Sequence, residues 1–432
     1  MRLRISTMNI VHKIESFLPQ KWVEAWRFYK KRHKKQMQYA RKIKELRNSN
    51  RPIRVYFFVL DASVWKYESV YRYMLSDNRF IPKILVCPIT NQSRQYMLDK
   101  MNRCYSYFIS RGYDVQKAYD EVKDLYVDAD LLESDIIFYT NPYRYLIDDR
   151  YYIDKFGNVL TCYCNYSYCN VPLKYSCADV FHQLVWRYYI ECDDNLLQVK
   201  KFYSAKNSVV TGYPMIDNFI NHVPATWPWK LRDMNLKRII WAPHHTIEGN
   251  TDDIAFSTFL EYYDLMLEIA EKYSDQIQVV FKPHSILKQA LYKHPKWGVE
   301  RTDAYYAKWA NGYNTAYEDG DYVDLFLTSD AMIHDCGSFI IEYLYTNKPV
   351  MLLDNGIRLS QSNNAGRNAY NCHYIGNCRS DILNFVNNLI NENDEKAVMR
   401  ANYYKKYLLQ PYGNSVAENI VNDIIVKIYG KR

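Results

Sequence analysis

The chain has 432 residues, of which 48% are hydrophobic, and its net charge is +8 at pH 7. This length exceeds one ordinary hydrophobic core, so we expect two domains. No apolar run approaches the roughly 18–20 residues of a membrane span, and the first apolar groups lie among charges rather than in a signal-peptide core. The sequence therefore predicts a cytoplasmic protein without a membrane-spanning helix.

The positive charge belongs to the N-terminal arm. Residues 1–54 contain 16 Lys/Arg and 3 Asp/Glu, whereas the other 378 residues contain 40 and 45. A mildly acidic body argues against a nucleic-acid groove across it, so we expect no nucleic-acid partner.

A basic helix is predicted over 13–47, within an arm that we place at 1–50. Trp22, Trp26, Phe28 and Tyr29 lie close together there, and lysines and arginines fill most of the remaining positions. Such a helix suits an anionic membrane surface, which predicts peripheral binding at the inner face of the cell membrane. The alternative is that the aromatic side packs on the protein's own domain while the charges stay solvated.

After the arm, apolar strands alternate with helices. The predicted strands are 53–60, 83–89, 134–140, 158–166 and 208–214, with helices at 62–76 and 91–111. Continuous apolar strands that alternate with helices indicate a parallel sheet covered on both faces. We place this acceptor-side domain at 51–225.

A second series begins after "NHVPATWPWK" (221–230), which has the Pro and Trp content of a linker. Its strands are expected at 237–243, 277–284, 324–330, 331–335 and 348–354, and its helices at about 253–273 and 301–317. We place this donor-binding domain at 226–380, and three helices at 381–432 that pack across both domains. The predicted fold is α/β, with two doubly wound, Rossmann-like domains and a cleft between them.

Four of the ten cysteines lie in "TCYCNYSYCNVPLKYSC". Cys162, Cys164, Cys169 and Cys177 lack the paired C-x-x-C spacing of a zinc site. We interpret them as reduced thiols that behave as small buried hydrophobic residues.

Polar motifs follow several strands of the second series. "WAPHH" places His244 and His245 after one strand, and "FKPH" places Lys282 and His284 after the next. "HDCGS" follows a third strand, and "TGYP", with Gly212, closes the first series. The carboxyl ends of parallel strands share one edge of a sheet, so these side chains are candidates for a single site.

The stretch "HDCGSFIIEYLY" predicts an anion site at the start of a helix. Asp335 is expected to cap the helix, and the N–H groups that follow would face an anion. Gly337 leaves room for close approach, beside Ser338. Glu342 lies one turn further along the same face, where its carboxylate could accept both hydroxyls of a ribose. The alternative is a plain capped helix with Glu342 exposed.

"VTGYPMID", "WAPHH", "FKPH" and "TSDAMIHDCGSFIIEYLYTNKPVMLLDN" resemble, in this order, the CDP-glycerol glycerophosphotransferase family of teichoic-acid primases and polymerases. The resemblance spans about 205–365 and implies a GT-B-like fold whose C-terminal domain binds a CDP-alditol. It implies that His284 and Ser338 contact the donor diphosphate and Glu342 the ribose, with His244 in the same cleft. Lys282, Asp335, Gly337 and Gly212 complete the expected donor site.

One element of that family is missing. The family's N-terminal domain carries Trp-His-Gly before Pro-Leu-Lys, and its histidine is the proposed base. The Pro-Leu-Lys sequence is present here as Pro172, Leu173 and Lys174, but no histidine precedes it. His182 is the nearest histidine that could replace the base.

The expected reaction transfers an alditol phosphate from a CDP-linked donor to a hydroxyl of a cell-surface polysaccharide or teichoic-acid-like precursor, which is a glycan or lipid-linked acceptor. No paired-aspartate motif follows a strand, so we expect no metal and no cofactor beyond the donor. The alternatives are a GT-B glycosyltransferase that uses a nucleotide-activated sugar and a non-catalytic scaffold of glycan assembly.

Overall fold

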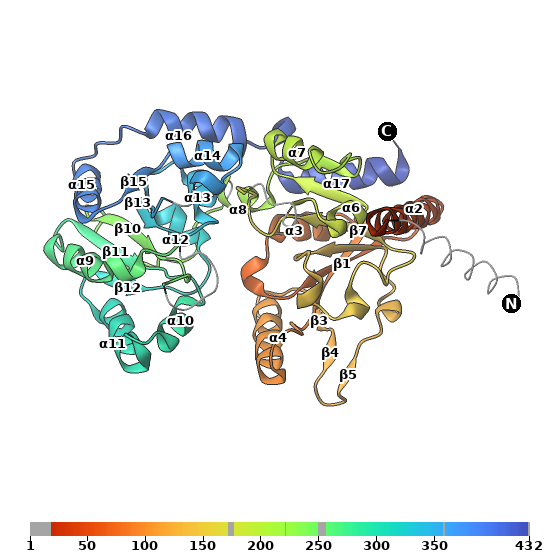
Figure 1. The fold of residues 1–432 in the computed structure, drawn as a ribbon, viewed down its shortest axis with the longest axis horizontal. Helices are drawn as coiled ribbons and strands as arrows, with labels where there is room; N and C mark the ends of the chain where they lie inside the picture. The colour runs from red at the N-terminus through yellow and green to blue at the C-terminus, as the bar shows by residue number, and fades with distance from the viewer. Residues whose placement is uncertain (1–18, 172–176, 221, 249–255, 357–358, 431–432) are drawn as a thin grey trace, which may run out of the picture.

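The computed structural model describes residues 19–171, 177–220, 222–248, 256–356 and 359–430. It has two α/β domains side by side, each built on a parallel sheet (Figure 1). The predicted fold class is therefore confirmed. Pro172, Leu173 and Lys174 lie outside the described residues.

The N-terminal sheet has the strand order β3-β2-β1-β6-β7-β8-β9, with all neighbours parallel. Its strands are β1 (Ile53–Val59), β2 (Phe80–Val86), β3 (Val115–Lys117), β6 (Ile136–Tyr139), β7 (Leu160–Cys164), β8 (Arg187–Ile190) and β9 (Ser208–Val210). The covering helices include α3 (Glu68–Ser76), α4 (Arg94–Ile109), α6 (Val180–Leu184) and α7 (Asp193–Lys200). Strands β1, β6 and β7 are almost wholly buried, as their continuous apolar sequences predict.

The C-terminal sheet has the strand order β12-β11-β10-β13-β14-β15, the doubly wound order of a nucleotide-binding fold. Its strands are β10 (Lys237–Ala242), β11 (Ile277–Phe281), β12 (Thr315–Tyr317), β13 (Ala331–His334), β14 (Val350–Leu353) and β15 (Tyr374–Gly376). The helices are α9 (Phe259–Lys272), α10 (Leu287–Lys293), α11 (Gly298–Asn311), α12 (Val323–Thr328), α13 (Phe339–Glu342), α14 (Asn364–Asn371) and α15 (Arg379–Ile390).

Two predicted elements are wrong. The helix expected over 301–317 ends at Asn311 and is followed by strand β12, and the strand expected at 324–330 is helix α12. Short apolar runs cannot be assigned to strand or buried helix from periodicity alone. Strands β3, β8 and β15, of three or four residues each, were not predicted.

The chain ends by returning to the N-terminal domain. Helix α16 (Ala397–Tyr403) lies over the C-terminal domain, and α17 (Val416–Tyr429) packs against α3 and α2 (Gln20–Arg47) (Figure 1). Asp217 accepts the N–H groups of Val416 and Ala417 at the start of α17. Arg187 and Asp423 form a two-point ion pair with both N···O distances at 2.7 Å, which fixes α17 to β8.

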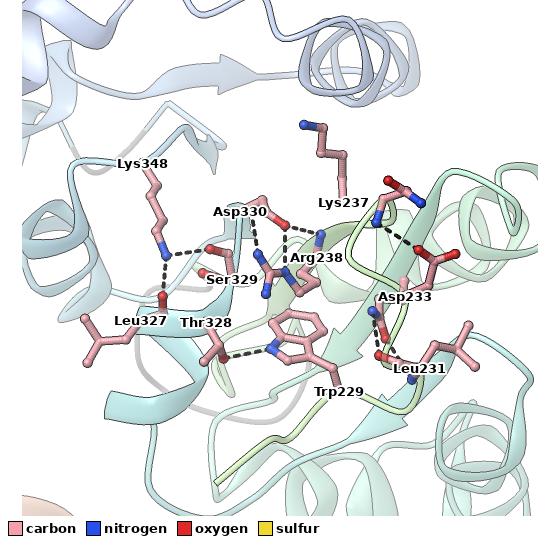
Figure 2. Close-up of polar contacts among 12 residues, drawn as sticks. Trp229, Leu231, Asp233, Lys237, Arg238, Leu327, Thr328, Ser329, Asp330 and Lys348 are labelled. Carbon is pink, nitrogen blue, oxygen red and sulfur yellow. Dashed lines mark hydrogen bonds and ion pairs between the residues drawn. The ribbon is translucent and has the colours of Figure 1, made fainter. Parts of the chain in front are cut away.

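The linker is fixed at the amino ends of the C-terminal strands (Figure 2). The Trp229 indole donates to Thr328 Oγ1 at 2.8 Å, and Arg238 forms a two-point ion pair with Asp330 at 2.8 and 3.0 Å. The Lys348 ammonium donates to the carbonyls of Leu327 and Ser329. These contacts lie at the edge of the sheet opposite the predicted site, so they stabilise the domain without entering that site.

The arm helix α2 contacts the N-terminal domain through lysines and tyrosine rather than through its tryptophans. Tyr39 and Leu46 are buried, Lys42 pairs with the buried Asp135 at 2.8 Å, and the Lys35 ammonium donates to the Phe156 carbonyl at 2.5 Å. Burial lowers the pKa of Lys35 to about 8.

The opposite side of α2 carries solvent-exposed aromatic side chains. Trp22, Trp26 and Tyr29 are 71%, 39% and 65% exposed. The alternative that these aromatic residues pack on the protein's own domain is therefore wrong for these three, although Phe28 is partly buried. Within the described part of the chain, no helix combines the length and apolar character that a membrane crossing needs.

Candidate functional site

Three histidine rings meet at the carboxyl ends of β10 and β11. The centroid of His245 lies 4.2 Å from that of His244 and 4.2 Å from that of His284, and the outer two rings are 5.1 Å apart. One ring nitrogen from each residue lies within 4.8 Å of the others, the only His/Cys/Asp/Glu grouping with metal-ligand spacing among the residues that the structure describes. The "WAPHH" and "FKPH" motifs thus meet at one edge of the sheet.

Hydrogen bonds to the rings favour an anionic ligand over a metal ion. The backbone N–H of Ile286 donates to His284 Nδ1 at 3.3 Å, and that of Thr246 donates to His244 Nδ1 at 3.4 Å. Because Nδ1 of His284 accepts, the neutral tautomer of that ring carries its proton on Nε2, whereas Nδ1 of His244 also lies 2.9 Å from Thr246 Oγ1, a contact in which it either donates or accepts. An Nε2–H group donates to a phosphate oxygen, whereas a metal would require the Nε2 lone pair.

The electrostatics keep the His284 ring neutral. Burial, followed by the nearby His245 and Lys282, lowers the pKa of His284 to about 4. Burial also lowers the pKa of Lys282, whose ammonium donates to the Gly320 carbonyl at 2.8 Å. The site therefore presents one amine and one neutral imidazole near the end of β11.

Asp335 positions this group and does not cap helix α13. Its carboxylate accepts the backbone N–H of His244, and it also accepts from Thr258 N at 2.6 Å, Thr258 Oγ1 at 3.0 Å and Ser257 Oγ at 3.2 Å. The residue is 1% exposed. It ties the end of β13 to the end of β10 and the start of α9, so it acts through His244 rather than as a direct donor ligand.

The helix expected after "HDCGS" is present but short. α13 is a single turn, Phe339–Glu342, that continues as a 3₁₀ segment (η6, Tyr343–Thr346). Gly337 and Ser338 are partly exposed, and the Asn170 amide of the N-terminal domain donates to the Gly337 carbonyl at 2.8 Å. The turn therefore faces the opposite domain, as the predicted anion site requires, but with a weaker helix dipole than a full helix would supply.

Glu342 is neither exposed nor free for a ligand in this structure. It is 1% exposed, and one carboxylate oxygen accepts the hydroxyl of Tyr213 at 3.2 Å while the other accepts that of Tyr322. Lys66 lies 3.8 Å from the carboxylate and donates to the Tyr322 hydroxyl at 2.7 Å. Two hydroxyls on one carboxylate is the pattern that the two hydroxyls of a ribose would make.

Two predicted site residues have packing roles in this structure. Gly212 has φ +91°, and a Cβ there would lie 2.7 Å from Val416 and 3.0 Å from Pro411, so glycine is required for the C-terminal segment to pass. His182 is fully buried, and its Nδ1 accepts the N–H of Asp179. In this structure the ring is closed to solvent, and its expected role as a catalytic base stays a prediction.

Sequence reasoning missed Lys66, Tyr322 and Asn170. Lys66 follows β1 by seven residues, beyond the strand-end positions that pattern analysis inspects. Tyr322 precedes α12, which was taken for a strand. The cysteines agree with their interpretation: Cys162, Cys164 and Cys177 are buried and Cys169 is partly buried.

The chain matches the family model described as CDP-Glycerol:Poly(glycerophosphate) glycerophosphotransferase over residues 191–426, which is more than half of its length. This match contains the histidine group, the "HDCGS" turn and Glu342. A search of curated protein sequences finds no match.

Solved structures show the same two-domain fold. A variant of the wall teichoic acid polymerase TagF has a TM-score of 0.53 at 13% identity, covering 95% of this chain and 98% of that one. MnaA of S. aureus with UDP has a TM-score of 0.54 at 14% identity, covering 88% and 98%. UDP-GlcNAc 2-epimerase of Neisseria meningitidis bound to UDP-GlcNAc has a TM-score of 0.52 at 15% identity, covering 87% and 99%.

Proposed function

This chain belongs to the CDP-Glycerol:Poly(glycerophosphate) glycerophosphotransferase family, and from that membership we propose how its own residues hold the donor. The protein is an enzyme, a transferase that moves glycerol phosphate from a CDP-linked donor to a glycan or teichoic-acid-like acceptor. We propose that the donor diphosphate binds between the histidine group (His244, His245 and His284) and the "HDCGS" turn.

One observation carries this proposal. The neutral His284 imidazole, with its proton on Nε2, lies beside the His244 ring at the neighbouring strand end, and the Asp335 carboxylate that accepts the His244 backbone N–H follows the third strand. Fixed donors beside a buried amine stabilise negative charge without reorganisation during the reaction. A diphosphate is the ligand that this arrangement matches in charge and in hydrogen-bonding capacity.

The proposed reaction breaks the bond between the glycerol phosphate and CMP. The acceptor hydroxyl attacks the distal phosphorus and loses its proton, its P–O bond forms as the bond to CMP breaks, and CMP leaves with the electron pair. Phosphoryl transfer of this kind depends mainly on positioning and charge stabilisation. The charge stabilisation would come from His284, His244 and Lys282. The Glu342 carboxylate would exchange its two tyrosine partners for the ribose hydroxyls.

Donor preference is the direct test. CDP-glycerol at a concentration 100 times its Kd is expected to stabilise the protein by about 2.7 kcal/mol, because it binds the folded state alone. UDP-, GDP- and sugar-linked nucleotides at the same concentration are expected to give smaller thermal shifts. Differential scanning fluorimetry measures this, with CMP as the control for the nucleotide portion.

The product distinguishes the alternatives. With a donor labelled at the distal phosphorus, glycerophosphate transfer leaves the label in the polymer, whereas a glycosyltransferase would leave both phosphates on the nucleotide. A non-catalytic scaffold would release no CMP. Absence of phosphorus from the product would overturn the transferase proposal.

We also propose that the arm helix binds the protein to an anionic membrane surface on the cytoplasmic side. Helix α2 contains eleven Lys/Arg and two Glu, and the Lys30 ammonium lies 3.3 Å from the ring centroid of Trp26. Exposed tryptophans among basic residues favour the headgroup region of a bilayer.

Replacing Trp22, Trp26 and Tyr29 together by alanine is expected to weaken binding to vesicles that contain anionic lipid by about tenfold. Vesicle co-sedimentation measures it, with Tyr313→Ala as a matched exposed aromatic on the C-terminal domain. Deletion of the arm is a poorer test, since it also removes the buried Tyr39 and Leu46. Equal binding by the triple variant and the wild type would contradict this location.

A further inference from the structure

A cavity of about 410 Å³ lies beside helices α14 and α16, outside the proposed donor site. This volume falls within the usual range for ligand sites. None of the histidines, Ser338 or Glu342 lines it. Its wall combines two lysines, Lys396 and Lys406, with the amides Asn368, Asn371 and Asn402.

A rare backbone conformation builds one wall of the cavity. After α16, residues Tyr404–Leu408 (η8) form a π-helical turn that carries Lys406 and Tyr407. Such turns are uncommon inside helices and occur frequently at functional sites. The ring of Tyr407 packs at a tilt against that of Tyr403, the last residue of α16, with centroids 4.7 Å apart.

The same turn connects the cavity to the N-terminal domain. Tyr407 is 5% exposed, its hydroxyl donates to Asp194 of α7 at 2.8 Å, and its carbonyl accepts the hydroxyl of Tyr168 at 3.1 Å. Asn368 donates to the Tyr407 hydroxyl at 3.0 Å. The cavity therefore borders the junction of the two domains and is held rigidly there.

The charge of the side chains that line the cavity favours an anionic ligand. No Asp or Glu is among its lining residues. Lys396 donates one N–H to the Asn371 carbonyl at 2.8 Å, which leaves two for a ligand. The Lys406 side chain is 62% exposed, lies over the Tyr407 ring at 4.5 Å from its centroid, and has Asp194 3.9 Å away as its acidic neighbour.

We propose that this cavity is a second binding site, which holds a polyol-phosphate segment of the growing acceptor away from the reacting end. The lysines match the phosphates of such a segment, and the three amides match its hydroxyls, since each amide both donates and accepts. The proposal rests on the proposed function for the identity of the polymer, but binding can be measured without catalysis.

The test titrates the full chain with an oligo(glycerol phosphate) at low ionic strength, by isothermal titration calorimetry. The double variant Lys396→Gln/Lys406→Gln is expected to bind about tenfold more weakly, a change of roughly 1.4 kcal/mol. Lys406→Gln alone, at an exposed position, is expected to give a smaller loss. Lys405→Gln is the matched control, because Lys405 is exposed on the same turn but does not line the cavity.

Glycerophosphate transfer to a short soluble acceptor is expected to remain unchanged in all three variants. Unchanged oligomer binding by the double variant, or equal binding of an uncharged polyol chain, would overturn the second site. Failure of the proposed function gives a different result, in which the wild-type protein releases no CMP from CDP-glycerol with any acceptor.

Discussion

Replacing His284 by alanine is expected to lower the rate of CMP release from CDP-glycerol by at least about 100-fold, the range found when one fixed donor to a developing charge is removed. The ring lies within the histidine group, and its Nδ1 accepts the Ile286 N–H, so Nε2 must donate. Radiolabelled or coupled detection of CMP measures the rate. Undiminished release would remove His284 from the mechanism.

A glutamine at position 284 distinguishes between two roles of the histidine, hydrogen-bond donor and base. Its amide can donate a hydrogen bond as Nε2–H does, but it cannot accept a proton. If His284 acts as a donor to the diphosphate, His284→Gln is expected to retain more activity than His284→Ala. If His284 acts as the base, both variants are expected to be equally impaired. His33→Ala, on the exposed side of α2, is the control.

The pH dependence of kcat/KM provides a further check on the His284 prediction. The pKa of His284 is lowered to about 4, so the ring is neutral above that value and becomes a cation only as the pH falls through it. Since kcat/KM reports the free enzyme, His284 is expected to contribute no acid limb near 6.5, the ordinary histidine value. An acid limb near 6.5 that disappears in His284→Gln would contradict the neutral assignment.

The parallel sheets and the convergence of motifs were predictable because they depend on local pattern. Strands such as β1 and β10 are continuous apolar runs, and the residues after them must share a sheet edge whenever the strands are parallel and neighbouring. This logic placed His244 and His284 together. It failed for α12, since an apolar run of six residues fits a strand and a buried helix equally well.

The partners of the site residues could not be predicted, because they join segments that are distant in sequence. Glu342 meets Tyr213 from the other domain, and Lys66 reaches Tyr322 across 256 positions. No local pattern records such pairings. The same limitation explains His182, whose sequence context "VFHQLVW" does not reveal that its ring packs between Tyr163 and Tyr188.

Asp335 also joins segments that are distant in sequence, and its replacement is the second change with a large expected effect. Replacing it by alanine is expected to lower the free energy of unfolding of the C-terminal domain by about 3 kcal/mol, because buried N–H groups of His244 and Thr258 lose their acceptor together. Chemical denaturation followed by tryptophan fluorescence measures this, since Trp241 is buried in that domain.

Asp335→Asn separates stability from positioning. The amide keeps one oxygen acceptor but replaces the other with an N–H₂ group that repels the N–H donors, so an intermediate loss of stability is expected. If Asp335 fixes the histidine group, this variant is also expected to raise the Kd for CDP-glycerol while it remains folded. Asp319→Ala, at an exposed carboxylate near Lys282, should leave the free energy of unfolding unchanged. A stable Asp335→Ala protein with normal donor affinity would show that the carboxylate does not position His244 for the donor.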